Sequence, residues 1–219
     1  MPASPCLTLV ETTRSRYAWH AWHAPGVDAV PRWCYGKAMK TGSSLAAISC
    51  FLTLSLHAGE FPDAWTWDDD AKARNQHAAL EGKPMPPLQV QGWVNGEVKP
   101  ADMKGKVVIV DFYATWCGPC MAAIPHNNDL LEKYKDKGLV IVGVCTSDQG
   151  QERMPQTVKD KGIKYPTARD PQLKSETAWQ VHYYPTYAIV DRKGIVRIIG
   201  LQPDHVEEVI KKLLAEPQV

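Results

Sequence analysis

The chain has 219 residues, which is enough for one domain of ordinary size with extensions. Its 25 Lys and Arg residues nearly balance its 24 Asp and Glu residues, so the net charge is +1. No charge excess points to nucleic acid or to an anionic membrane surface as a partner. The sequence also contains no internal repeat and no glycine-rich phosphate-binding loop.

An apolar stretch at residues 43–56 follows two basic residues, Lys37 and Lys40. It has roughly the length of a signal-peptide core and is shorter than a membrane span. We therefore expect residues 39–59 to be a signal peptide, which implies export to the periplasm or another extracytoplasmic compartment. An uncleaved membrane anchor, or a lipid attached at Cys50, is the alternative to cleavage.

The residues before this leader, 1–38, are a mixture of Trp, His, Pro and Arg with no sustained hydrophobic period. A signal peptide normally begins at the start of a chain. We expect translation to begin at Met39, so that residues 1–38 are a non-native upstream or disordered extension.

Residues 60–86 predict a short helix followed by a proline-rich connector. The acidic residues at 68–70 supply N-cap candidates for a helix that runs through Leu80. Polar and apolar residues then alternate at 88–94, which predicts a strand, and Asn95-Gly96 is typical of a β-hairpin turn.

Residues 87–219 predict one α/β domain, because strand patterns alternate with helix patterns. An apolar run at 107–114 predicts a buried strand, and a helix is expected at 119–137 with a kink at Pro125. The elements expected after it are a strand ending at Cys145, a helix at 152–161, a short strand around Tyr165, a helix at 171–179, a hairpin of 187–191 with 195–199, and an amphipathic helix at 204–214.

Cys117 and Cys120 are separated by two residues and stand where the strand at 107–114 leads into a helix. Thiol-disulfide exchange needs a thiolate, and a cysteine with an unperturbed pKa of about 8.5 supplies little of it at neutral pH. A helix N-terminus favours the anion through its unpaired N–H groups and its macrodipole. The pattern therefore predicts that Cys117 attacks and Cys120 resolves the mixed disulfide. Pro119 suits the first helical turn because it lacks an N–H.

Three other interpretations of the cysteine pair stay open. The pair is half of a zinc site if other ligands exist, but no second Cys-x-x-Cys and no downstream His pair completes one. A purely structural disulfide is the second reading. It would stabilise the fold little, because a bridge across so short a loop hardly reduces the entropy of the unfolded chain. A chance pair in a core is the third reading, because cysteine is often buried. Cys145, which ends an apolar run, is most simply a buried core residue.

Asp111 interrupts the apolar strand pattern. Its side chain either faces water, or it is buried at a cost that raises its pKa toward the range useful for a general base.

Four separated motifs complete the pattern: residues 104–120, which end in Trp-Cys-Gly-Pro-Cys, then Ile124-Pro125, Tyr184-Pro185-Thr186 and residues 189–194. On these motifs the chain resembles the thioredoxin superfamily, and in particular its exported TlpA-like and ResA-like thiol-disulfide oxidoreductases. The resemblance covers about residues 85–214, and the motifs are specific in combination.

The resemblance implies a thioredoxin-like three-layer α/β fold, in which a central mixed β-sheet is flanked by helices and the cysteine pair opens a helix. It implies that Pro185 is cis and lies opposite the cysteines, where the backbone of Tyr184 would pair with a bound peptide. It also implies that Asp111 lies beneath the cysteines and relays a proton to and from Cys120. The residues expected to shape the docking groove are Trp116, Gly118, Pro119, Tyr184 and Pro185.

The exported branch often has a glutamate three residues after the second cysteine, where this chain has Ala123, so a mechanism that uses that glutamate is in doubt. The Gly118-Pro119 dipeptide is the one found in reducing thioredoxins and favours a reductase. The resemblance implies protein thiol or disulfide substrates, such as a cytochrome apoprotein, another exported protein or mispaired proteins. It also implies a membrane protein that donates electrons to this one. We expect this protein to bind no metal and no cofactor.

The sequence leaves two alternative functions open. A peroxiredoxin-like thiol peroxidase shares the fold but needs a peroxide-polarising arginine near its cysteine, for which there is no motif. A non-catalytic peptide-binding module would keep the cysteine pair as a permanent disulfide.

Overall fold

The computed structural model describes residues 60–68 and 70–217, all of which belong to one structural unit of the chain. Residues 1–59, with the expected leader and Cys50, lie outside the described part, so the signal-peptide and start-site hypotheses stay predictions. None of the helices formed by the described residues is both long and apolar enough to cross a membrane.

The centre of the sheet is formed by two runs of β-branched residues. β2 (Val107–Tyr113) and β3 (Leu139–Cys145) are parallel neighbours, and their register places Asp111 opposite Gly143. Parallel strands need a crossover connection, which α3 (Gly118–Tyr134) supplies here. The expected buried strand and the helix that follows it are thereby confirmed.

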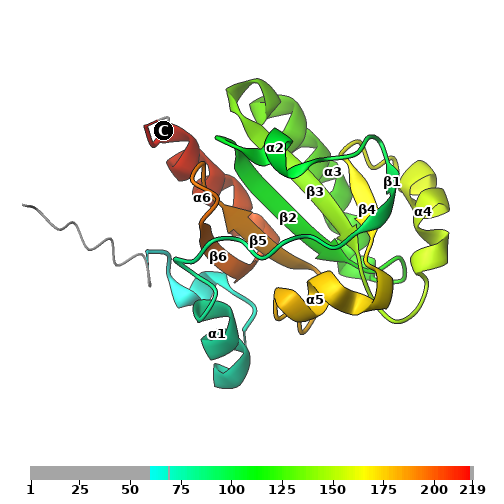
Figure 1. The fold of residues 1–219 in the computed structure, drawn as a ribbon, viewed down its shortest axis with the longest axis horizontal. Coiled ribbons are helices and arrows are strands. Elements are labelled where there is room, and N and C mark those ends of the chain that lie inside the picture. Colours follow the sequence, from blue (N-terminus) through cyan, green and yellow to red (C-terminus); the bar gives the residue numbers. More distant parts are fainter. Residues whose placement is uncertain (1–59, 69, 218–219) are drawn as a thin grey trace, which may run out of the picture. The chain divides into compact units, whose positions relative to one another are not determined.

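The six strands form one mixed sheet in the order β1-β4-β3-β2-β5-β6 (Figure 1). β4 is parallel to β3, whereas β1, β5 and β6 are antiparallel to their neighbours. The expected hairpin near the C-terminus is confirmed as β5 paired with β6. The bounds of the outer strands are β1 (Gln91–Val94), β4 (Thr167–Arg169), β5 (Thr186–Val190) and β6 (Val196–Leu201).

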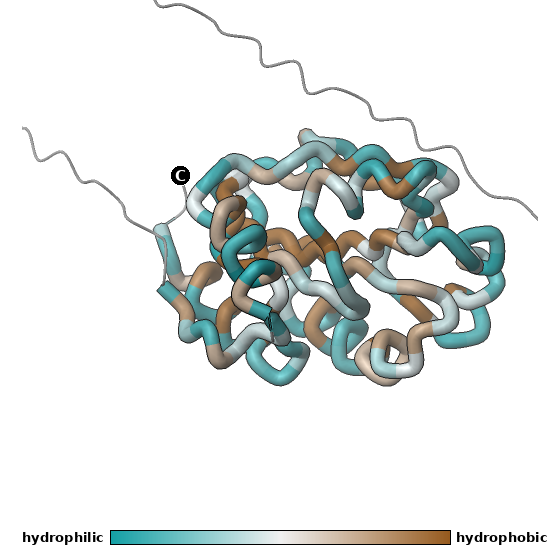
Figure 2. The backbone as a smooth tube through the Cα atoms, turned by 90° about the horizontal axis from the view of Figure 1, so that it is seen from below, coloured by the Kyte–Doolittle hydropathy of each residue, from teal (hydrophilic) through white to brown (hydrophobic). Residues whose placement is uncertain are grey.

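Successive side chains of β2 point to opposite faces of the sheet, so the strand contributes to a hydrophobic core on each face. Ile109 and Tyr113 belong to a cluster packed by α3, α4 (Met154–Lys161) and α6 (Pro203–Ala215). Val108 and Phe112 belong to a second cluster, covered by the connector at 85–98, by α2 (Pro100–Met103) and by Trp179 after α5 (Lys174–Ala178). Figure 2 shows the hydrophobic segments in the interior and hydrophilic ones around them. The described residues also form the 3₁₀-helices η1 (Asp63–Trp65), η2 (Lys135–Lys137), η3 (Gln151–Arg153) and η4 (Pro171–Leu173).

The segment before the connector runs along β6 at the edge of the sheet. Thr66 forms an isolated antiparallel bridge with Leu201, and Pro84 forms one with Ile195. Between these bridges lies α1 (Ala71–Ala78), whose N-cap is Asp70, as the acidic run indicated. A covered edge strand offers fewer unpaired backbone groups to other chains.

The prediction of a hairpin at Asn95-Gly96 is wrong. Both residues have positive φ, 63° and 102°, but β1 pairs with β4 and not with the next strand along the chain. The physical reason is the Asn95 side chain, whose Nδ2 donates to the carbonyl oxygen of Ile163 at 2.6 Å and ties the turn to the segment that leads into β4. Pro125 lies inside α3, and the helix continues beyond it to Tyr134.

Candidate active site

Cys117 is the N-cap of α3, because the chain leaves β2 and turns at once into a helix. Its backbone is extended, with φ −78° and ψ 109°, and its N–H donates to the carbonyl oxygen of Ala114 at 3.1 Å. Gly118 and Pro119 occupy the first helical positions. Proline has no N–H, and no hydrogen bond within the helix is lost there, because N–H groups of the first turn have no helical partner. The sulfur of Cys117 is bonded to that of Cys120, and each residue is only 4% exposed.

The electrostatics at the start of α3 favour negative charge on Cys117. Its Sγ accepts a hydrogen bond from the backbone N–H of Cys120 at 3.1 Å. The first turn of α3 contains no acidic residue to oppose the helix dipole. An N–H donor at a helix N-terminus is the kind of environment that favours a cysteine thiolate over a thiol.

Trp116 is exposed next to the disulfide, although it is a large apolar residue, with 63% of its surface accessible. Its indole Nε1 donates to Ser147 Oγ at 3.1 Å. Its ring packs edge-on against the ring of Tyr184, with 5.9 Å between the ring centroids. The hydroxyl group of Tyr184 donates to Glu176. An exposed ring held from two sides is a ready surface for a partner chain.

The loop before β5 carries Tyr184 and Pro185. The peptide bond between them is cis, as the resemblance implies. Tyr184 packs against the core cluster that contains Cys117 and Cys120. Trp116, Gly118 and Pro119 therefore adjoin the disulfide in the chain, and the ring of Tyr184 contacts that of Trp116.

Asp111 is buried on the face of the sheet that α3 covers, with 3% of its surface exposed. The alternative that its side chain faces water is therefore wrong. Burial raises its pKa to about 7, against the opposing effect of hydrogen bonds donated to its Oδ2 by Tyr165 and Asn127, each at 3.0 Å. Its Oδ1 is buried and receives no hydrogen bond from the described residues. A buried carboxyl that titrates near neutral pH fits a general base.

Sequence reasoning missed the residues that hold Asp111. Asn127 lies seven positions after Cys120 on the same face of α3, and it also donates to the hydroxyl oxygen of Tyr187 at 2.9 Å. Tyr187 stands opposite Asp111 in the antiparallel β2–β5 register, so it shares its face of the sheet. Burial raises the pKa of Tyr165 and of Tyr187, which keeps both hydroxyl groups protonated, and Tyr165 is the one that donates to Asp111. A polar residue on an otherwise apolar helix stripe was the one available signal for Asn127.

Cys145 is a buried core residue, as expected. Its side chain has no exposed surface, and it ends β3 opposite Tyr113. Burial raises the pKa of its thiol to about 12, so it supplies no thiolate near neutral pH.

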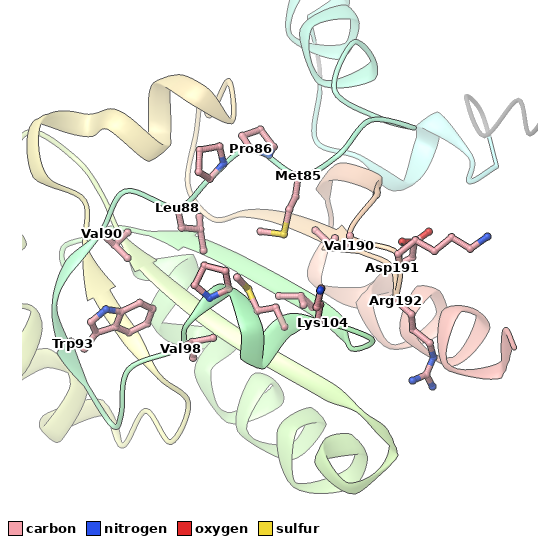
Figure 3. A pocket seen from close by; sticks show the side chains of 16 residues that line it. Met85, Pro86, Leu88, Val90, Trp93, Val98, Lys104, Val190, Asp191 and Arg192 are labelled. Atoms are coloured by element: carbon pink, nitrogen blue, oxygen red, sulfur yellow. The ribbon is translucent and has the colours of Figure 1, made fainter. Parts of the chain in front are cut away.

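An apolar cavity of about 380 Å³ lies on the opposite face of the sheet from the cysteines (Figure 3). Leu88, Val90 and Trp93 of the connector line it, together with Val108 of β2. Val108 points away from Asp111, because residues separated by an odd number along a strand face opposite sides. The cavity is therefore not part of the site that contains Asp111 and the disulfide.

Comparison with known proteins assigns the fold to a family. The model of the AhpC/TSA family matches residues 82–199, which is more than half of the chain. The chain belongs to this family. Protein DipZ of Mycobacterium bovis is 38% identical over 118 residues, which cover 50% of this chain and 17% of DipZ. The thiol-disulfide oxidoreductase ResA of Bacillus thuringiensis is 33% identical over 135 residues, which cover 60% of this chain and 78% of ResA.

A solved structure that is similar to this chain agrees with the architecture. A protein from Chlorobium tepidum described as a thiol:disulfide interchange protein DsbE has a TM-score of 0.55 and 30% sequence identity, covering 62% of this chain and 98% of its own. The expected three-layer fold with a mixed sheet between helices is confirmed. The resemblance to the TlpA-like and ResA-like thiol-disulfide oxidoreductases of the thioredoxin superfamily is also confirmed.

Proposed function

We propose that this chain is an exported enzyme that exchanges disulfides with protein thiols through Cys117 and Cys120, and that it acts as a reductase. The observation that carries the proposal is the position of the pair at the start of α3, where Cys117 Sγ accepts the N–H of Cys120. The relatives named thiol-disulfide oxidoreductase support the same chemistry.

In the reductive direction the Cys117 thiolate attacks one sulfur of a substrate disulfide. A mixed disulfide forms, and the first substrate sulfur leaves as a thiolate. The Asp111 carboxylate takes the proton of the Cys120 thiol, and the resulting thiolate attacks Cys117 Sγ. The second substrate sulfur then leaves, so that two electrons have passed to the substrate and the Cys117–Cys120 disulfide remains. The elevated pKa of Asp111, about 7, suits a group that must accept this proton and later return it.

The substrate groove is formed by residues on both sides of the disulfide. Trp116 would contact the substrate with its exposed ring, and the backbone of Tyr184, before cis-Pro185, would pair with an extended substrate segment. Gly118 leaves the approach to Cys117 open, since a Cβ there would meet no atom within 4 Å.

The direction of exchange and the compartment complete the proposal. Gly118-Pro119 between the cysteines favours reduction of substrates. A reductase in an oxidising compartment must itself be reduced after each turnover, which calls for a membrane protein that delivers electrons from the other side. The apolar stretch at 43–56 supports export.

Reduction of insulin by dithiothreitol, followed by turbidity, tests the activity. We expect the wild-type chain to accelerate it, and both Cys117→Ser and Cys120→Ser to abolish the acceleration. Turnover that survives either substitution would overturn the mechanism. A chain that consumes hydrogen peroxide but leaves insulin unreduced would support the peroxidase instead.

The physiological substrate can be captured with the Cys120→Ser variant. Without the resolving thiol, the mixed disulfide at Cys117 has no internal thiol to break it and accumulates. We expect this variant, and not Cys117→Ser, to retain protein partners that a reductant releases. Mass spectrometry of the released proteins then distinguishes a cytochrome apoprotein from a general pool of mispaired proteins.

A further inference from the structure

A buried polar cluster ties α1 to the loop that carries Tyr184 and Pro185. The side chains of Asp68 and His77 have no exposed surface. His77 Nδ1 lies 2.9 Å from Asp68 Oδ1, and His77 Nε2 donates to the carbonyl oxygen of Gln180 at 2.8 Å. Because a carbonyl oxygen can only accept, this second bond fixes the orientation of the ring against the start of the loop.

The same carboxylate also holds the middle of the loop. The hydroxyl group of Tyr183 donates to Asp68 Oδ1 at 2.8 Å. Tyr183 directly precedes Tyr184, and its carbonyl oxygen accepts from Thr186 Oγ1 at 2.6 Å. The loop from 180 to 185 is thus bonded to α1 and its N-terminal approach at two points, one on either side of His182.

The cluster is packed too closely to rearrange freely. Gly200 of β6 faces it, and a Cβ at that position would lie 2.7 Å from the Tyr183 hydroxyl oxygen, 3.0 Å from His77 Nδ1 and 3.1 Å from Asp68 Oδ1. The pKa of Asp68 is lowered because hydrogen bonds from His77 and Tyr183 outweigh the opposing desolvation. A buried network with this many bonds to one carboxylate specifies one loop geometry.

Contacts of Glu81 anchor α1 to the sheet without reaching the loop, and they meet the cluster through Arg74, whose Nη1 also donates to Asp68 Oδ2 at 3.3 Å. Glu81 accepts a hydrogen bond from Arg74 Nη2 at 2.6 Å and another from the backbone N–H of Ile199 at 3.3 Å. Glu81 is as well buried as the cluster, with 5% of its side chain exposed. It therefore offers a matched control for a general loss of stability.

We propose that Asp68 and His77 are positioning residues, which hold the loop at 180–185 in the conformation that binds protein substrates. This inference rests on the proposed function, and it assigns part of the substrate site to the segment at 60–82. If the loop is free to move, a protein substrate must order it on binding, which weakens its affinity. A small disulfide that reaches only Cys117 makes no such demand.

The test compares Asp68→Asn and Tyr183→Phe with Glu81→Gln in the insulin reaction. Tyr183→Phe removes the hydrogen bond from the loop to Asp68, and Asp68→Asn weakens it by removing the charge of the acceptor. We therefore expect KM for insulin to rise roughly three- to tenfold while kcat stays within about twofold. The reduced variants should react with the small disulfide 5,5′-dithiobis(2-nitrobenzoate) at the wild-type rate. Glu81→Gln should lower Tm and leave KM unchanged. An unchanged KM in Tyr183→Phe, or an equal rise in Glu81→Gln, would overturn the proposal.

Hydrogen exchange separates this inference from the proposed function. We expect the amides of 182–184 to exchange faster in Tyr183→Phe than in the wild type, and at the wild-type rate in Glu81→Gln. This readout needs no turnover, so it remains decisive if the wild-type chain fails to reduce insulin. Unaltered exchange in Tyr183→Phe would show that the cluster does not hold the loop.

Discussion

Cys117 Sγ and the backbone nitrogen of Cys120 lie 3.1 Å apart at the first turn of α3. This N–H is one of the helix donors that have no partner within the helix, so its bond to sulfur costs no other hydrogen bond. It also places a partial positive charge beside the sulfur that must become an anion. This asymmetry between the two sulfurs supports the proposed roles, in which Cys117 attacks and Cys120 resolves.

Alkylation of the reduced protein should be selective. We expect iodoacetamide at pH 7 to modify Cys117 before the other cysteines of the described domain, because the thiolate is the reacting form. Cys145 should stay unmodified in the folded protein, since it is fully buried and its pKa is raised to about 12. Mass spectrometry of tryptic peptides measures the order, with Cys117→Ser as the control. Equal labelling of Cys117 and Cys145 would contradict the assignment.

The Asp111→Asn substitution should change how stability depends on pH. Burial raises the pKa of Asp111 from 3.8 to about 7, so between these values the folded protein binds a proton that the unfolded chain has released. The stability that this proton contributes is complete below pH 3.8 and is lost as pH rises through 7. We expect the free energy of unfolding in urea to fall between pH 5 and pH 8.5 by about 3 kcal/mol more in the wild type than in Asp111→Asn. Asp129→Asn, at an exposed position of the same helix, should leave the wild-type profile unchanged.

The same substitution should slow the second step of exchange more than the first. Asn cannot accept the Cys120 proton, so the mixed disulfide on Cys117 should persist in Asp111→Asn. Quenching with acid during insulin reduction and separating the products on a non-reducing gel measures its amount. We expect its amount to increase roughly tenfold or more at pH 7, because a positioned general base typically accelerates its step by about 10²- to 10⁴-fold. A mixed disulfide no more abundant than in the wild type would remove Asp111 from the mechanism.

Two tryptophans should respond to truncation in opposite ways. Trp116→Ala removes a ring that is 63% exposed, so we expect a stability change below about 1 kcal/mol and a weaker reaction with insulin. Trp179→Ala removes a fully buried ring that packs against Phe112 at 5.6 Å, so we expect a loss of about 3–5 kcal/mol. Thermal unfolding and insulin kinetics on both variants measure the contrast. A large drop in stability for Trp116→Ala would show that its ring mainly serves packing.

Gly200→Ala should be more harmful than Gly194→Ala. Both glycines have positive φ, 85° and 78°, so both substitutions carry a similar backbone strain. A Cβ at Gly200 would meet the cluster of Asp68, His77 and Tyr183, whereas one at Gly194 would meet nothing within 4 Å. We expect Gly200→Ala to lower the free energy of unfolding by about 1–3 kcal/mol more than Gly194→Ala. Equal losses would mean that the cluster yields to the extra methyl group.

Much of this domain could be predicted from the sequence, because the relevant signals are local. The buried strand before Cys117, the helix that opens at Gly118 and the hairpin of β5 and β6 each appear as a run with its own period or turn residues. The prediction of a hairpin after β1 was wrong because a contact between residues far apart in the sequence decides the pairing there. Asn95 has the backbone of a turn, but its side chain bonds to Ile163, which is distant in sequence.

The order of the residues was enough to indicate the proposed reaction centre, because two cysteines, a glycine and a proline at a strand-to-helix junction lie within one helical turn. The burial of Asp111 with Asn127 and Tyr165, and the contact of Asp68 and His77 with the loop before Pro185, became known from the folded structure. Such groups come together through the pairing of strands and the packing of helices. Hydrogen bonding and desolvation between residues far apart in the chain leave no pattern that the order of the residues reveals.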